Sequence, residues 1–393
     1  MTKAFVAMIL SKVKRNPIIM GGLTAAIDWF RIFFGLFWRA SSVILGAFFK
    51  GIFTVLWDID SSFPASDGRW SAWRPPFGRK VSGEMAVRRA LKGWHPLDSA
   101  LVSVEGSKRA LPPICYPELA GSLQSRMLAQ YMLLMLLMIA MAAGFSVVGF
   151  AVSDHMFQKA GLVLALFLVF VGLQYFFIYR DRHRLAQFSR FSSWCYLQPY
   201  LRVVGMVGVL VVAGAIQYFV QASEGGLVPV VERYGLVFSQ ASAEPWRYLT
   251  GPFFHSGLPH WLANVSLLAV AAALAFALGR TSVIWLIFLI GVLVPGVLLT
   301  FLPHWVGRDA FLGVSGGVYA LYGWLGGVTF RRRLDFPKGL WWVIAYFATA
   351  TLLAASLLDP RASWFAHVFG LLAGYAAGLA LVGLRSELRT QNI

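Results

Sequence analysis

The stretch that organises this chain reads Phe311-Leu312-Gly313-Val314-Ser315-Gly316-Gly317-Val318-Tyr319. It places one serine just inside the start of an apolar helix that ends at Arg331-Arg332-Arg333. Glycines on both sides of Ser315 allow neighbouring backbones to come close and leave the hydroxyl uncrowded. Taken alone, the stretch is open to two interpretations. The serine is either a reactive group or part of a small-residue packing face, with its hydroxyl bonded to its own helix.

The composition is that of a membrane protein. Of the 393 residues, 58% are hydrophobic and 13% are charged, whereas a soluble protein carries about a quarter charged residues. Several apolar runs reach the roughly 20 residues that a helix needs to cross a bilayer. We therefore predict an all-α polytopic membrane protein. Its net charge of +17 is attributed to Lys and Arg kept on the cytoplasmic side rather than to a nucleic-acid partner.

Eight apolar runs predict eight spanning helices. We place them at 127–152, 160–179, 203–221, 259–278, 282–302, 312–330, 340–358 and 364–384. The first two form an additional hairpin at 127–179, which a basic cytoplasmic loop at 180–202 joins to a six-span core at 203–384. The longest connection, 222–258, is too apolar for a solvated loop and is expected to lie partly in the membrane, packed on the bundle.

The first 126 residues form a region of different character. Residues 16–57 are aromatic and aliphatic but are interrupted by Asp28, Arg31 and other charges, which are costly at the centre of a bilayer. We expect one or two helices lying in the interface, with an additional spanning hairpin as the alternative. Residues 58–126 are polar and rich in proline, and they are either a small cytoplasmic module touching anionic lipid or a solvated linker.

The charges of the loops predict the orientation. From residue 127 on, the loops on one side carry twelve Lys and Arg, and those on the other side carry five. The positive-inside bias then places both termini in the cytoplasm, including the tail 385–393. We expect a multi-pass protein of a bacterial inner (plasma) membrane. The two cysteines, Cys115 and Cys195, fall in cytoplasmic segments, where a disulfide is not expected.

Three spans bring polar chemistry to one depth. His260, Ser315 and His367 lie 18, 15 and 17 residues above their predicted cytoplasmic ends, which corresponds to roughly 27, 22 and 25 Å of helix. Polar groups at such positions are costly and usually face a cavity. His260 and Asn264 are four residues apart and share one helix face, and so do Ser315 and Tyr319.

These residue types suit acyl transfer. A serine needs a base to become a nucleophile, and histidine is the usual one. A developing oxyanion needs donors held in place beforehand, such as Asn264, His260 and the N–H of Ser315. The last span carries His367 beside a stripe of Gly370, Gly374 and Gly378, and such stripes permit close approach of a neighbouring helix. If that neighbour is the serine helix, His367 reaches Ser315. Since no Asp or Glu lies in these spans, the sequence allows a Ser–His dyad rather than a triad.

The segment from Glu244 to Gly378 resembles the core of the rhomboid intramembrane serine proteases. The resemblance rests on four motifs, which are Trp246-Arg247, His260-x-x-x-Asn264, Gly313-Val314-Ser315-Gly316 and Ala366-His367-x-x-Gly370-x-x-x-Gly374. With the first core span it covers residues 203–384, less than half of the chain, and it says nothing about the N-terminal 200 residues.

The resemblance implies a role for each matching position. It implies that Ser315 is the nucleophile, that His367 is the general base, and that Tyr319 orients the imidazole. It also implies that His260 and Asn264 stabilise the oxyanion. His255 matches a histidine that braces the outer loop, and Trp246 with Arg247 matches a pair that anchors this loop. The expected substrates are single-pass or polytopic membrane proteins, cut within their transmembrane segments near the outer face. No cofactor is expected.

Four alternative interpretations are open to these residues. Gly313-x-Ser315-x-Gly317 also fits the nucleophile elbow of soluble esterases, which needs a strand before the serine. A metal site would use His255, His260, His304 and His367, but no His-Glu-x-x-His motif occurs in the sequence. A small polytopic transporter would place ionisable groups near the middle of the membrane and show paired repeats. A rhomboid-like protein that binds substrates without cleaving them stays open, as does the oligomeric state.

Overall fold

The computed structural model describes residues 70–75, 78–91, 94–95, 98–104, 110–151, 155–198, 200–302, 309–358 and 363–385. The chain divides into two compact units, Met1–Asp58 and Ile59–Ile393, and all of the described residues belong to the second. The interfacial helices expected within 16–57, and the tail after residue 385, lie outside the described residues.

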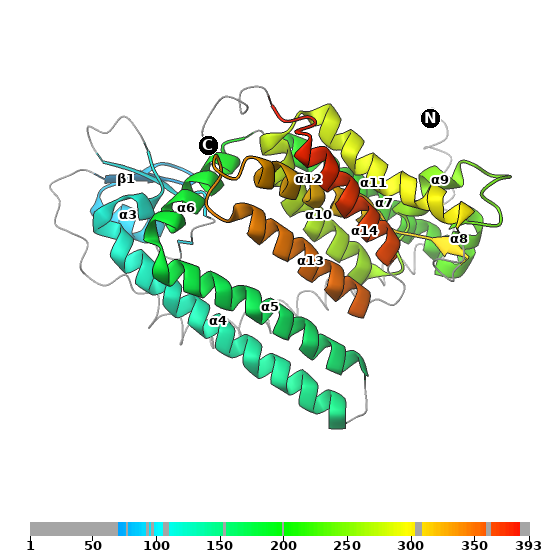
Figure 1. Ribbon diagram of the computed structural model, residues 1–393, viewed down its shortest axis with the longest axis horizontal. Helices are drawn as coiled ribbons and strands as arrows, with labels where there is room; N and C mark the ends of the chain where they lie inside the picture. Colours follow the sequence, from blue (N-terminus) through cyan, green and yellow to red (C-terminus); the bar gives the residue numbers. More distant parts are fainter. Residues whose placement is uncertain are drawn as a thin grey trace, which may run out of the picture. The chain divides into compact units, whose positions relative to one another are not determined.

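Helices dominate the described part of the chain (Figure 1). Their bounds are α4 (Pro117–Ala151), α5 (His155–Arg180), α6 (Arg182–Tyr196), α7 (Leu201–Glu224), α10 (Leu258–Leu278), α11 (Thr281–Phe301), α12 (Ser315–Arg331), α13 (Leu340–Leu358) and α14 (Trp364–Leu379). Six of them are long and apolar enough to cross a membrane, namely α4, α5, α7, α10, α11 and α13. The chain is therefore an all-α polytopic membrane protein, as predicted. A helix occupies each of the eight expected spans, although α12 and α14 are shorter than the spans predicted for them. That α4 and α5 cross the bilayer stays a prediction.

α12 is the central helix of the bundle. Every residue from Ser315 to Thr329 is buried, and α10, α11, α13 and α14 all pack against it (Figure 1). Five glycines among these residues allow close neighbours on several sides. The helix begins at Ser315, three residues later than expected, because Gly313 has a φ of +102° and cannot continue a helix.

α12 and α14 pack backbone against backbone. A Cβ atom added to Gly370 would collide with the carbonyl oxygen of Gly316, and one added to Gly374 would collide with that of Ala320. The stripe of small residues predicted in the last span thus faces the serine helix. Because the two backbones are so close, a side chain near the top of α14 can reach the first residue of α12.

The region before α4 contains a small antiparallel sheet, which the sequence did not predict. Strands β1 (Trp70–Trp73), β2 (Val81–Ser82) and β3 (Leu101–Val104) lie in the order β2-β1-β3, with Ser71 opposite both Ser82 and Ser103. The short helix α3 (Glu84–Leu91) and the 3-10 turn η1 (Pro113–Cys115) complete the fold. Trp70, Val87 and Trp94 form its core with the first turns of α4. This segment is a folded module rather than a linker, because its scattered apolar residues meet in one core.

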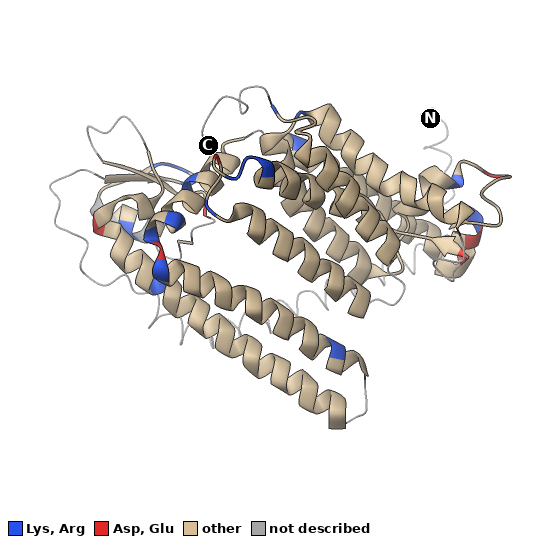
Figure 2. Ribbon diagram, in the orientation of Figure 1, with Lys and Arg blue, Asp and Glu red and all other residues tan. Residues whose placement is uncertain are grey.

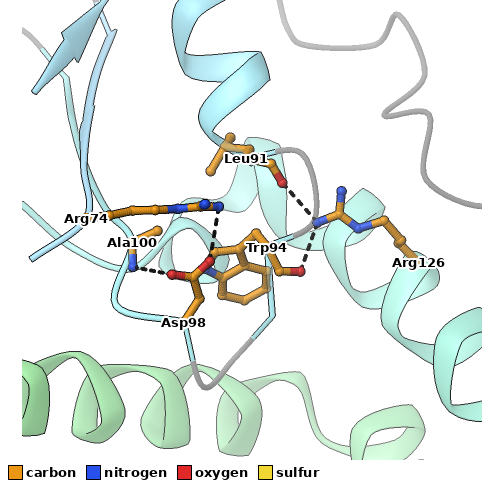
Figure 3. A network of polar contacts seen from close by, with 6 residues as sticks. All are labelled: Arg74, Leu91, Trp94, Asp98, Ala100 and Arg126. Carbon is orange, nitrogen blue, oxygen red and sulfur yellow. Dashed lines mark hydrogen bonds and ion pairs between the residues drawn. The ribbon is translucent and has the colours of Figure 1, made fainter. Parts of the chain in front are cut away.

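Polar contacts tie the module to α4 (Figure 3). The buried guanidinium of Arg126 donates hydrogen bonds to the carbonyl oxygens of Leu91, at 3.2 Å, and Trp94, at 3.1 Å. Asp98 pairs with Arg74 at 3.1 Å and accepts the N–H of Ala100 at 3.1 Å. α4 begins at Pro117, ten residues before the expected span, because its first turns belong to this module.

The expected basic loop at 180–202 is largely a helix, α6, which corrects the prediction. The carboxylate of Asp181 caps the helix by accepting the N–H of Arg184 at 3.0 Å. Phe188, Phe191 and Trp194 recur at intervals of three residues and pack on the core of the six-helix bundle. Arg182, Arg184 and Arg190 on the same helix hid this apolar face, which is visible once the spacing is read as helical.

The connection 222–258, called the outer connection below after its predicted side of the membrane, is folded onto the bundle, as expected. It contains α8 (Leu227–Tyr234), strand β4 (Leu236–Val237), α9 (Arg247–Thr250) and the 3-10 turn η2 (Gly251–Phe253). β4 pairs antiparallel with β5 (Ala310–Phe311), with Leu236 opposite Phe311. A buried cluster that includes Leu236, Phe311 and Ala366 joins the connection to the approaches of α12 and α14.

The hairpin of α4 and α5 contacts the bundle through α13. The hydroxyl of Tyr346 donates to the carbonyl oxygen of Leu166 at 2.6 Å, and its ring stacks on Phe170 with centroids 5.1 Å apart. Figure 2 shows Lys and Arg gathered at α6 and at the loop that leads into α13; that this end faces the cytoplasm stays a prediction.

Candidate active site

Ser315 and His367 are joined by a hydrogen bond. His367 Nε2 lies 2.7 Å from Ser315 Oγ. His367 is 1% exposed and Ser315 is 8% exposed. Ser315 is the first residue of α12, and His367 lies in the first turn of α14. The glycine contacts between these helices set the distance, which is short enough for proton transfer from the hydroxyl to the imidazole.

Tyr319 lies one helical turn below the serine and against the histidine. Its ring centroid is 4.6 Å from that of His367, with an angle of 40° between the planes. Tyr319 is 2% exposed, so its position is determined by packing. A buried aromatic ring packed on the imidazole is suited to limiting its rotation.

A cavity of about 600 Å³ opens beside the dyad. It is lined by α10, the turn before it, α12, α13 and α14, through Ser256, Gly257, Pro259, His260, Ala263, Asn264, Ser266, Leu267, Ser315, Tyr319, Thr351, Ala354, Ala355, Leu358 and His367. Its volume falls in the range of pockets that bind small molecules or short peptide segments. Most of its wall is apolar, and the polar groups converge near Ser315.

His260 and Asn264 lie on the wall of this cavity, as their spacing predicted. Asn264 is 3% exposed, and its Nδ2 has no hydrogen-bond partner within the described residues. Such a buried donor is costly unless a ligand group accepts from it. His260 Nδ1 lies 3.0 Å from Ser256 Oγ. A Cβ added to Gly313 would be 3.3 Å from His260 Nε2 and 3.7 Å from Ser315 Oγ, so this glycine keeps the space between imidazole and serine open.

Residues 242–384 match the rhomboid domain family. This part of the chain is a rhomboid domain. No curated protein and no solved structure matched the chain. The match begins in the outer connection and contains α10 to α14, so the dyad and the cavity both lie within it, whereas α7 and the preceding residues lie outside it.

The backbone of His255 joins the outer connection of the rhomboid domain to α7, whereas the bracing role of its ring stays a prediction. The side-chain amide of Gln217 donates to the carbonyl oxygen of His255 at 2.7 Å and accepts its N–H at 2.9 Å. The His255 ring stands edge-on to His260 with centroids 5.2 Å apart. Burial, with a smaller effect of His260, lowers the pKa of His255 to about 3, so this ring stays neutral near pH 7.

Trp246 and Arg247 lie in the outer connection and do not line the cavity of the rhomboid domain. The buried guanidinium of Arg247 pairs with Glu244 at 2.7 Å and donates to the carbonyl oxygen of Gly235 at 2.7 Å. It also lies over the ring of Trp246, 4.9 Å from the centroid. These contacts fold the connection onto itself, so we expect both residues to shape the loop rather than the chemistry.

Three residues near the site were not singled out from the sequence. Gln217 is a polar residue inside the apolar span of α7, and its intramembrane position was the signal that could have found it. Ser256 and Thr351 line the cavity but are common residues in loops and spans, so nothing in the sequence marks them. The metal alternative gains no support, since the described residues contain no group of three or more potential ligands and His304 lies outside them.

Proposed function

We propose that this protein is an intramembrane serine endopeptidase that cuts transmembrane segments of other membrane proteins near the outer face. Ser315 is the nucleophile and His367 the general base. The hydrogen bond of 2.7 Å between His367 Nε2 and Ser315 Oγ carries the proposal, because a serine becomes a nucleophile only beside a base that can take its proton. The rhomboid domain match supports the class of reaction.

In the proposed reaction, Ser315 Oγ attacks the carbonyl carbon of the scissile peptide bond while His367 Nε2 takes the hydroxyl proton. The resulting imidazolium then gives this proton to the leaving amine, and the acyl group stays on Ser315. A water molecule, deprotonated by His367, releases the acyl group and restores the serine. Tyr319 keeps the imidazole in place through each of these transfers.

Three donors are available for the oxyanion. The amide of Asn264 and the ring of His260 line the cavity beside Ser315. The N–H of Ser315 belongs to the first turn of α12, where N–H groups have no acceptor within the helix. Donors held by packing before the reaction stabilise developing charge without reorganising. Asn264 supports this role best, since its Nδ2 has no other partner among the described residues.

The cavity also suits the proposed substrate class. Ala354, Ala355 and Leu358 of α13, with Ala263 and Leu267 of α10, give it apolar walls next to the catalytic pair. A transmembrane helix hides its peptide bonds in its own hydrogen-bond ladder, so the substrate must unwind locally before attack. Segments with glycine, proline or other helix-breaking residues near the cleavage site are therefore the expected substrates. The excess of basic residues in the loops on one side supports a site near the outer face, with both termini cytoplasmic.

A serine-reactive fluorophosphonate tests the proposal on the full chain. We expect the probe to label the wild type and to lose its signal in Ser315→Ala, and we expect Ser266→Ala to retain it. Ser266 is a matched control because it lines the same cavity. The same three proteins should then be assayed on a transmembrane test substrate. Labelling without cleavage of any such substrate, or cleavage by Ser315→Ala, would favour a binding protein or a different mechanism.

A further inference from the structure

A second cavity, of about 140 Å³, lies between the additional hairpin and the start of α13. It is lined by His95, Met127, Tyr131, Phe170, Gln174, Phe177, Ile178, Arg184, Leu185, Phe188 and Val343. None of these residues lines the cavity beside Ser315. The walls are aromatic and aliphatic, and Arg184 supplies a full positive charge.

Arg184 is a buried cation that makes no salt bridge within the described residues. It is 8% exposed, and within the described residues its guanidinium makes no hydrogen bond or ion pair. Its guanidinium lies over two aromatic rings instead. The Cζ atom is 3.8 Å from the ring centroid of Phe177 and 5.6 Å from that of Phe188. The nearby Asp181 uses its carboxylate to cap α6. Desolvation lowers the pKa of Arg184, and the charge of Asp181 opposes this shift without cancelling it. A guanidinium removed from water is costly unless a counter-ion compensates its charge.

The start of α13 adds a second attraction for an anion. A Cβ added to Gly339 would lie 3.2 Å from Arg184 Cζ, so the guanidinium stands directly beside the residue that precedes α13. The N-terminus of a helix of 19 residues carries partial positive charge, although the N–H groups of Leu340 and Trp342 already donate to the carbonyl oxygens of Pro337 and Gly339. The backbone N–H of Lys338 donates to Gln187 at 3.3 Å, which holds α6 against this helix start.

The cavity lies near one end of α5 and of α13, where we expect the lipid headgroups of the cytoplasmic side. Phe177 and Ile178 are within four residues of the end of α5, and Val343 is three residues into α13. Figure 2 shows further Lys and Arg around this level, on α6 and in the loop before α13. Basic pockets between spanning helices at this depth are suited to the phosphate of a lipid headgroup.

We propose that Arg184, beside the positive end of the α13 dipole, binds the phosphate of an anionic phospholipid at this cavity, between the hairpin and the rhomboid domain. The volume is smaller than the roughly 300 Å³ that encloses a drug-sized molecule. It suits a phosphodiester and the first part of an acyl chain, with the rest of the chains in the bilayer along α5 and α13. The inference does not depend on proteolysis.

Native mass spectrometry of the full chain tests the site, with phosphatidylglycerol and phosphatidylcholine as the probes. We expect the wild type to retain one phosphatidylglycerol and no phosphatidylcholine. Arg184→Met keeps an unbranched stem for the contacts with Phe177 but removes the charge. It should weaken retention about ten- to a hundred-fold, the loss expected for charge-assisted hydrogen bonds to a phosphate. Arg184→Lys should retain most of the binding.

Arg182→Met is the matched control, because Arg182 lies on the same helix, is exposed, and donates to Gln124 outside the cavity. It should bind as the wild type does. If Arg184→Met does not fold, Val343→Phe fills the cavity without removing the arginine and should also abolish retention. Equal retention by the wild type and a folded variant would overturn the site. Retention of phosphatidylcholine as strongly as phosphatidylglycerol would overturn recognition of the charge. Equal competition by glycerol 3-phosphate would show a free phosphate site instead of a lipid site.

Discussion

At the scale of single residues, Ser315 and His367 are expected to act as one unit. Without the base the hydroxyl keeps its proton, and without the hydroxyl the base has nothing to activate. Ser315→Ala and His367→Ala should therefore each abolish cleavage, and the double variant should be no slower than either single variant. Rates on a transmembrane test substrate, with melting temperatures to confirm folding, would check this. Additive losses would mean that the two residues act separately.

Asn264 is expected to contribute to catalysis through its amide alone. Removing a single oxyanion donor from a serine protease slows turnover by about 10²–10³-fold. Asn264→Ala should cause a loss of turnover that approaches this value. The loss will be smaller if His260 and the N–H of Ser315 still stabilise the oxyanion. Labelling by the fluorophosphonate and steady-state kinetics would separate attack from binding. A variant with both Asn264→Ala and His260→Ala that cleaves at the normal rate would exclude both residues from the oxyanion site.

His255 makes the stability of the fold depend on pH. Its pKa is about 3 in the folded chain and about 6.5 when unfolded, so the unfolded chain takes up the proton first as the pH falls. The free energy of unfolding is therefore highest above about pH 6.5 and falls progressively towards pH 3. The loss is on the order of 2 kcal/mol by pH 4.5. Melting curves between pH 7 and 4 should show this loss. His255→Gln should flatten the dependence, and an unchanged profile would assign the acid sensitivity to other groups.

At the scale of elements, the contact between α12 and α14 holds the dyad together. Alanine at Gly370 would collide with the backbone of α12, and overpacking of this kind costs about 1–3 kcal/mol. We expect Gly370→Ala to lower the melting temperature and to reduce cleavage severely, because the helices that carry Ser315 and His367 must move apart.

Gly205→Ala is the control for this substitution. Gly205 is exposed on α7, with nothing within 4 Å of an added Cβ, and alanine is the better helix former. It should be neutral or slightly stabilising and fully active. Normal activity of Gly370→Ala would mean that the bundle accommodates the methyl group without displacing the dyad.

At the scale of the whole molecule, α6 decides where the catalytic part can be separated from the rest. Phe191 and Trp194 pack on the core of the bundle, so a cut near Ser192 would divide the helix and expose this core. A chain that begins at Asp181, the cap of α6, should insert and cleave a permissive test substrate, whereas one that begins at Leu201 should be much less stable. Cleavage assays against Ser315→Ala, with melting curves, would measure both effects. An inactive but folded chain from Asp181 would show that residues 1–180 take part in catalysis.

The sequence alone determined the class of the protein and predicted the residues of its candidate site. Apolar runs near the length of a bilayer predict the helices because a chain in lipid must satisfy its backbone internally. The spacing of His260 and Asn264, and of Ser315 and Tyr319, predicts shared helix faces because the helical repeat is local. Both predictions depend only on neighbours along the chain, and the described helices confirm them.

Only the tertiary structure decided what depends on distant segments. The distance of 2.7 Å between Ser315 and His367 exists because glycines on two helices let their backbones touch. The pairing of Leu236 with Phe311, the hydrogen bonds from Gln217 to His255 and the small sheet around Trp70 join residues that are far apart in sequence. α6 was hidden for the same reason: its arginines suggest a solvated loop until the core that its phenylalanines cover is known. Local patterns encode the faces of helices, whereas the choice of partner for each face is settled by packing over the whole molecule.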